Sequence, residues 1–304
     1  MSFARYSAFW FVISCVSGCA ISEVDISPAV AQTETAQPDT PSEQQNRSNV
    51  RTLDELLLFQ PTKYPHGDWQ PAGLDFTDVW ITSKDGTRLH GWYCPAESPK
   101  AVMLYFHGNG GNLAGRASTL KFLQEELSVS VLIFDYRGYG RSDGKATVAG
   151  AIEDAQAARA ELAKLAGIDE SDVVLLGRSL GGAIAIQLAA DAPPRGLIVE
   201  SSFSSLREVA REHFPKLAWL VPKNKLDSEL AIADVRCPLL QSHGDADRVI
   251  SFESGRCLFA AAKQPKQFVV LTGLGHNDRP TREYYAAMAD FLERLPKQNI
   301  ATPQ

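Results

Sequence analysis

Residues 177–181 read Gly-Arg-Ser-Leu-Gly and place a serine between two glycines. In a Gly-x-Ser-x-Gly sequence a strand turns sharply into a helix, and the turn projects the serine hydroxyl as a nucleophile. The pentapeptide alone is weak evidence, because about one chain in ten of this length contains it by chance. Its setting is stronger: 172–176 is an apolar run typical of a strand, and 183–190 is typical of a helix. We therefore predict Ser179 as a nucleophile.

A serine hydroxyl needs a general base, and that base needs a partner that orients it. In a strand–turn–helix setting of this kind the acid follows the serine, and the histidine follows the acid. The chain has six histidines, and His276 lies in a glycine-flanked loop at 273–278, after the last predicted strand. We predict His276 as the base. His243 ends a strand and is expected to be structural.

The orienting acid is expected in the loop after the strand that ends at Ser242. That loop contains both Asp245 and Asp247, and position alone does not separate them. The carboxylate that does not orient the histidine is expected to cap the following turn or to pair with Arg248. Glu200, at the end of the preceding strand, is a third and weaker candidate.

A glycine-rich run, Phe-His-Gly-Asn-Gly-Gly-Asn at 106–112, follows another predicted strand. Glycines let the backbone approach a ligand closely, so this run is suited to hold an oxyanion with N–H groups. The expected donors are the backbone N–H groups of Asn109 and Leu180. The run lacks a Gly-Lys-Ser/Thr ending, and Gly-x-Gly-x-x-Gly spacing fails at Leu113, so nucleotide binding is not predicted.

The elements that must position these residues begin at about residue 74. Residues 75–82 alternate apolar and polar positions, a turn follows at 83–86, and 88–94 completes a predicted hairpin. Later apolar runs lack alternation, as parallel strands covered on both faces do. They lie at 101–106, 129–134, 173–176, 197–199, 239–242 and 268–271, and helices are predicted at 114–127, 147–166, 180–191, 252–263 and 280–295. This alternation predicts an α/β fold with a mostly parallel sheet and helices on both faces.

The stretch 203–233, between two predicted strands, is longer than a crossover helix requires. It contains Phe203, Phe214 and Trp219 together with many charges. We interpret it as a small helical cap that contributes to a substrate pocket. An ordinary crossover helix with a long loop is the alternative.

Five motifs between 75 and 295 together resemble those of α/β hydrolases. They are His-Gly-Asn-Gly-Gly-Asn at 107–112, Asp-Tyr-Arg-Gly-Tyr-Gly-Arg-Ser at 135–142, Gly-Arg-Ser-Leu-Gly-Gly at 177–182, His-Gly-Asp-Ala-Asp at 243–247 and Gly-His at 275–276. The sequence is most similar to the Bem46-like branch, also grouped with serine aminopeptidase S33-type domains. That resemblance implies an eight-stranded sheet, and the family's His-Gly-x-x-Asp pattern places the acid on Asp247. We assign no catalytic role to 135–142.

Together these residues predict hydrolysis of a small acyl ester or thioester through an acyl-serine intermediate. Ser179 would attack, His276 would move the proton, and Asp247 would orient the ring. A serine peptidase of the S33 type is one alternative, although no acidic or aromatic clamp for a peptide amine is identified. A non-catalytic, lipid-tethered binding module is another. No metal or organic cofactor is implied.

Composition limits the remaining possibilities. The chain has 304 residues, 44% hydrophobic and 22% charged, with a net charge of −6. That balance is typical of a soluble globular domain and gives no electrostatic case for nucleic acid. None of the five cysteines forms a Cys-x-x-Cys pair, so no metal site is predicted, and buried thiols are favoured over a Cys237–Cys257 disulfide.

The N-terminus is typical of an export signal, with Arg5 ahead of a short apolar run at 8–16. Val-Ser-Gly-Cys at 16–19 resembles the lipobox of bacterial lipoproteins, so residues 1–19 are predicted as a signal with lipid attachment at Cys19. The alternatives are a plain secretory signal or, less well fitted, lipidation at Cys15. Residues 20–52 have the composition of a disordered tether, and 53–298 are expected to form the hydrolase domain. These features predict a lipoprotein anchored to a membrane of the bacterial cell envelope.

Overall fold

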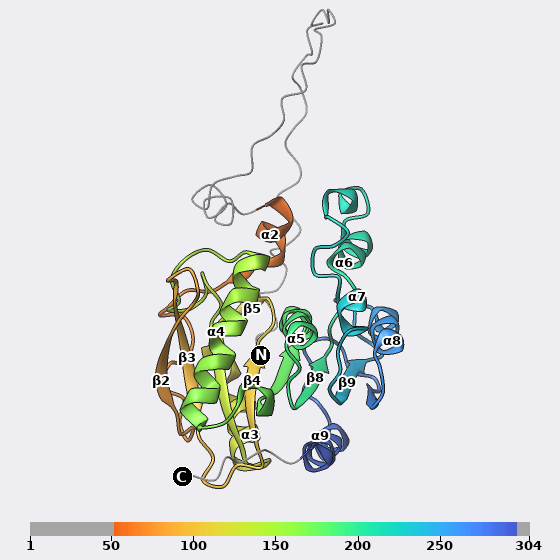
Figure 1. The fold of residues 1–304 in the computed structure, drawn as a ribbon. Coiled ribbons are helices and arrows are strands. Elements are labelled where there is room, and N and C mark those ends of the chain that lie inside the picture. Colours follow the sequence, from red (N-terminus) through yellow and green to blue (C-terminus); the bar gives the residue numbers. More distant parts are fainter. Residues whose placement is uncertain (1–51, 297–304) are drawn as a thin grey trace, which may run out of the picture. The chain divides into compact units, whose positions relative to one another are not determined.

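The computed structural model describes residues 52–296, and an eight-stranded sheet forms their centre (Figure 1). The strand order is β10-β9-β8-β7-β4-β6-β3-β2. The bounds are β2 (Thr77–Thr82), β3 (Arg88–Cys94), β4 (Ala101–Phe106), β6 (Val129–Phe134), β7 (Val174–Arg178), β8 (Gly196–Glu200), β9 (Leu239–Gly244) and β10 (Lys266–Leu271). Strand β3 runs antiparallel to β2 and β6, and the other neighbours pair in parallel. The predicted mostly parallel, eight-stranded α/β sheet is confirmed.

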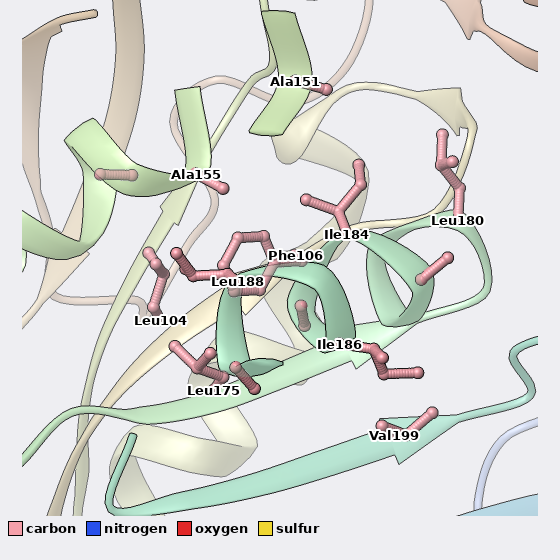
Figure 2. Packing of buried hydrophobic residues seen from close by; sticks show 14 of the residues in the cluster. Leu104, Phe106, Ala151, Ala155, Leu175, Leu180, Ile184, Ile186, Leu188 and Val199 are labelled. Carbon is pink, nitrogen blue, oxygen red and sulfur yellow. The ribbon is translucent and has the colours of Figure 1, made fainter. Parts of the chain in front are cut away.

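Two hydrophobic clusters cover the two faces of this sheet. Alternate residues of β4 belong to different clusters: Leu104 and Phe106 lie in one, Met103 and Tyr105 in the other. The first cluster includes side chains of α4 (Val148–Ala166), α5 (Leu180–Asp191) and α8 (Phe252–Ala261), and the second those of α3 (Ala117–Glu125) and α9 (Arg282–Arg294). Figure 2 shows the packing of α5 side chains over β4 and β7. Burial on both faces explains why these strands lack alternation in sequence.

A short helix, α2 (Leu53–Leu58), precedes the sheet and was not predicted. Thr52 and Glu55 form a capping box at its start. The Glu55 carboxylate also accepts the backbone N–H of Val148 at 3.0 Å and lies 3.2 Å from Nζ of Lys225. Helices of six residues are marginal by themselves, so these long-range contacts hold α2 in place.

The chain after α2 borders the glycine-rich run that sequence analysis assigned to the oxyanion. Strand β1 (Gln60–Pro61) pairs in parallel with β5 (Gly110–Gly111). The Asn109 side chain donates to the carbonyl oxygen of Leu58 at 3.1 Å. Helix α2 therefore lies at the end of the sheet where the parallel strands finish.

The stretch 203–233 folds as the predicted small helical cap. It contains α6 (Leu206–His213), the 3-10 turn η3 (Ala218–Leu220) and α7 (Ser228–Ile232). The stem of the cap is closed by an antiparallel bridge between Ser205 and Asp227. Nε2 of His213 lies 2.7 Å from the carbonyl oxygen of Val249, which links the cap to the loop after β9.

Strand β10 is an exception to the expectation of strands covered on both faces. It is the last strand of the sheet, and most of its side chains are only half-buried, with Val270 44% exposed. Its neighbour β9 is buried along its whole length. The difference follows from position at the sheet edge, which a local sequence pattern does not reveal.

The predicted signal, Cys15, Cys19 and nearly all of the predicted tether lie outside the described residues. Within residues 52–296 no helix has the length and apolar character needed to cross a bilayer. Lipid attachment and export remain predictions.

Candidate active site

Ser179 lies in the sharp turn between β7 and α5. Its backbone has φ 55° and ψ −120°, a strained region for a residue with a side chain. The neighbouring glycines are required by space: a Cβ at Gly177 would lie 2.4 Å from the carbonyl oxygen of Gly181, and one at Gly181 would lie 2.1 Å from that of Phe106. The turn is therefore the expected nucleophile geometry.

The structure brings Ser179, His276 and Asp247 together from three separate loops. Nε2 of His276 is 3.1 Å from Oγ of Ser179, and Nδ1 is 2.7 Å from Oδ2 of Asp247. These contacts span 97 and 29 residues of sequence. All three side chains are nearly buried. The arrangement is a continuous hydrogen-bonded path from a serine hydroxyl through an imidazole to a carboxylate.

The Asp247 carboxylate is held by groups on both of its oxygens. Oδ1 accepts the backbone N–H groups of Val249 at 2.8 Å and Ile250 at 2.9 Å. Oδ2 faces His276, and Nε2 of the buried His243 lies 3.4 Å away. Burial alone would raise the pKa of Asp247, but hydrogen bonds from His243 and His276 and from the backbone hold that pKa well below its usual range. The carboxylate stays ionised at neutral pH.

The structure separates the two aspartates that sequence position could not. Oδ1 of Asp245 accepts the backbone N–H of Gly273 at 2.6 Å, and its side chain is exposed. The expectation that the second carboxylate caps the turn or pairs with Arg248 was wrong, because Asp247 caps the turn itself with its other oxygen. Asp245 instead joins the acid loop to the loop that carries His276.

Glu200 does not contact the histidine. Its Oε1 accepts the Tyr284 hydroxyl at 2.6 Å, and burial raises its pKa. The backbone carbonyl of Glu200 accepts the N–H of Ser179 at 2.8 Å, so this residue supports the turn from beneath.

The glycine-rich run lies directly against the serine. A Cβ placed on Gly108 would be 3.6 Å from Cβ of Ser179. The carbonyl oxygen of Asn109 accepts the Tyr139 hydroxyl at 2.7 Å, which fixes this part of the backbone. Leu180 is the first residue of α5, where helix N–H groups have no carbonyl partner within the helix. The two predicted oxyanion donors thus lie on segments beside Ser179, and their role stays a prediction.

A buried His–Asp pair supports that run from behind. Nε2 of His107 is 3.4 Å from Oδ1 of Asp135, and both side chains are fully buried. The same Asp135 oxygen accepts the backbone N–H of Leu113 at 2.8 Å. Asp135 therefore ties the Leu113 end of the run to the end of β6 and lies beside the His107 ring.

Arg178 was not singled out by sequence reasoning, although it lies within the pentapeptide. Its guanidinium donates to the backbone carbonyl oxygen of His276. The residue before the nucleophile thus holds the loop that bears the base. A lone arginine next to a serine gives no sequence signal for this contact, because its partner is 98 residues away.

Metal ligands and reactive thiols are two further kinds of group that could carry chemistry among residues 52–296. No cluster of three or more His, Cys, Asp or Glu side chains could hold a metal ion there. The three cysteines in this range are free thiols. Burial raises the pKa of Cys94 and of Cys237 to about 12, so both stay protonated and unreactive.

Fold and site together define an α/β hydrolase, and comparison with known proteins agrees. A family model described as serine aminopeptidase, S33, matches residues 97–233. The α/β hydrolase domain-containing protein WAV2 of Arabidopsis thaliana is 33% identical over 253 residues, which cover 74% of this chain and 81% of WAV2. Protein bem46 of Schizosaccharomyces pombe is 27% identical over 266 residues, covering 82% and 88% of the two chains. The chain belongs to the α/β-hydrolase family and carries a Bem46-like domain.

Solved structures agree on the fold. An esterase of Pyrococcus furiosus superposes with a TM-score of 0.65 at 20% identity, covering 78% of this chain and 98% of the esterase. At that identity the likeness concerns the fold alone. The family membership and the fold make this protein a hydrolase.

Proposed function

We propose that this hydrolase cleaves small acyl esters or thioesters through a covalent acyl-Ser179. The observation that carries the proposal is the path Ser179–His276–Asp247, with contacts of 3.1 and 2.7 Å. A neutral His276 whose proton is on Nδ1 donates to Asp247 and leaves Nε2 free to accept from the serine. That is the protonation state that general-base catalysis needs.

The reaction would proceed in two halves. Ser179 Oγ attacks the carbonyl carbon while His276 takes its proton, and the negative oxygen of the tetrahedral intermediate is held by the N–H groups of Asn109 and Leu180. His276 returns the proton to the leaving alcohol or thiol as the acyl-serine forms. Water then attacks the acyl carbon and gives a proton to His276, which passes it to Oγ of Ser179 as the acyl–serine bond breaks and the acid leaves. Asp247 stabilises the imidazolium ion in both halves.

The test is labelling and turnover with matched serine variants. Wild type and Ser118→Ala, which alters an exposed serine on α3, should react with a fluorophosphonate probe and hydrolyse p-nitrophenyl butyrate. Ser179→Ala should lose the label and lose about 10⁴-fold or more in kcat. Equal labelling of the Ser179→Ala protein would refute the proposal.

A peptidase activity is the second candidate, favoured by the family model that matches residues 97–233. Ester and amide substrates separate the two possibilities. Aminoacyl-naphthylamides and short-chain esters should be offered to the same preparation, with Ser179→Ala as the blank. Turnover of the esters alone would exclude the peptidase, and preferential turnover of the amides would exclude the esterase.

A further inference from the structure

The cap carries an apolar surface that the proposed reaction does not use. Trp219 in η3 is 70% exposed, and its neighbours Leu217 and Leu220 are also exposed. Single exposed apolar residues are ordinary, but three within four positions of one turn are not explained by packing. The indole N–H donates only to the carbonyl of Lys216 at 3.1 Å, so its ring points away from the core.

Lysines lie beside the apolar side chains of this turn. Residues 213–226 contain Lys216, Lys223 and Lys225 and no aspartate or glutamate, while Glu212 and Asp227 border the stretch and Lys225 pairs with Glu55. Lys216 and Lys223 are exposed. Tryptophan and leucine flanked by lysines are the side chains that favour the boundary between a bilayer and water.

Helix α2 carries two further exposed leucines. Leu56 and Leu57 are exposed by 49% and 41%. Lys225 connects the two parts, because its Nζ donates to Oγ1 of Thr52 at 2.7 Å and lies 3.2 Å from the Glu55 carboxylate. Figure 1 shows α2 and α6 rising at the same end of the domain.

This surface borders the candidate active site on two sides. On one side, the backbone carbonyl oxygen of Leu58, at the end of α2, accepts a hydrogen bond from the side-chain amide of Asn109 in the predicted oxyanion run. On the other, His213 at the end of α6 contacts the carbonyl of Val249, whose N–H donates to Asp247. The elements that carry these side chains are therefore joined to the loops of the candidate site.

We propose that Leu56, Leu57, Leu217, Trp219 and Leu220, flanked by Lys216 and Lys223, form a lipid-contact surface that binds a bilayer containing anionic lipids. Indole and leucine side chains would enter the headgroup boundary, and the lysines would face lipid phosphates.

A second copy of the chain is a poorer occupant. In a two-fold interface the same patch meets itself. The exposed Lys216 and Lys223 of one copy would then face those of the other. An anionic bilayer offers the complementary charge, which is why we assign the surface to lipid.

Tryptophan quenching by brominated lipids tests which face meets the bilayer. Vesicles of 3:1 phosphatidylcholine and phosphatidylglycerol with brominated chains are mixed with full-length protein carrying Cys15→Ser and Cys19→Ser, which cannot be lipidated. One variant, Trp10→Phe with Trp80→Phe, keeps Trp219 as its exposed reporter among the described residues. Its matched control, Trp10→Phe with Trp219→Phe, keeps Trp80, which is 47% exposed on the edge strand β2. Both retain the buried Trp69 and Trp92.

The expected result is quenching in the variant that keeps Trp219 and little in the one that keeps Trp80. Equal quenching, or none in either while the protein sediments with the vesicles, would overturn the proposal. The result does not depend on enzymatic activity, so it stands or falls separately from the proposed function.

Vesicle partitioning tests the lysines. Lys216→Gln with Lys223→Gln should weaken binding to the anionic vesicles by about thirtyfold, about fivefold for each lysine near a charged surface. The control is Lys100→Gln with Lys164→Gln, which removes the same charge just before β4 and in the last turn of α4. It should change binding much less. Equal losses of vesicle binding in the two double variants would show that net charge alone drives binding, and would overturn the assignment of this surface. Concentration-dependent dimers in solution that Trp219→Ala abolishes would assign the surface to a second copy instead.

Discussion

Replacing Asp247 with asparagine tests the geometry of the triad most directly. Oδ1 of Asp247 accepts two backbone N–H groups, from Val249 and Ile250. An amide NH2 placed there would face two donors, so the amide oxygen must take that position. The NH2 group is then forced to the position of Oδ2, 2.7 Å from Nδ1 of His276.

The consequence is a histidine in the wrong tautomer. With a donor facing it, Nδ1 of His276 must accept, and the ring proton moves to Nε2. Nε2 then points an N–H at Ser179 and cannot take its proton. In the serine-protease template the equivalent exchange lowers kcat by about 10⁴, or about 5 kcal/mol of transition-state stabilisation. We expect a loss of the same order here.

The assay compares kcat/KM for p-nitrophenyl butyrate in wild type, Asp247→Asn and Asp245→Asn. In Asp245→Asn the amide oxygen can still accept from Gly273, so the expected loss is less than about tenfold. Near-ultraviolet circular dichroism checks that each variant is folded. The tautomer argument is refuted if Asp247→Asn keeps more than about a tenth of wild-type activity, or if the two variants lose activity equally.

Two further predictions concern contacts outside the triad. Arg178→Met removes the donor that holds the carbonyl of His276, so kcat should fall by about 10- to 100-fold with little change in KM, and Arg178→Lys should restore part of it; a change confined to KM would contradict this positioning role. Burial would raise the pKa of Glu55, but the N–H of Val148 and the ammonium of Lys225 hold this pKa below its ordinary value. The charged carboxylate therefore stabilises the fold above about pH 5. This contribution disappears as the pH falls through the lowered pKa. Glu55→Gln should therefore lower the free energy of unfolding by about 1–2 kcal/mol at pH 7 and by less at pH 3, measured by urea denaturation; an equal loss at both pH values would show that the charge is not responsible.

The sheet could be predicted from sequence because its signals are local. The unalternating run at 129–134 and the strand, turn and helix around Ser179 each contain their own pattern, and the structure places elements there. Helix α2 could not be found in this way. It has six residues, and what holds it is a carboxylate contact between Glu55 and Val148, 93 positions away.

Only those parts of the site that follow from the order of residues along the chain could be predicted. The order of residues identified His276 and favoured Asp245 and Asp247 over Glu200 as the acid, and the family pattern chose between the two aspartates. Asp247 contacts His276 with one carboxylate oxygen and caps its own turn with the other. These contacts, and the approach of His243 to the same carboxylate, depend on how the loop after β9 turns back. Hydrogen-bond geometry of that kind depends on three-dimensional contacts that residue types and spacing do not encode locally.

The position of β10 at the sheet edge has a consequence for how the enzyme would fail. His276 follows β10, the half-exposed strand that pairs only with β9 in the sheet, whereas Ser179 follows β7 in its buried middle. Edge segments open locally at lower free energy than a core does. The base is thus attached to a half-exposed edge strand and the nucleophile to a buried inner strand. Brief local opening of β10 would displace His276 while Ser179 stays in place. Warming would therefore cause a reversible loss of activity before the domain unfolds.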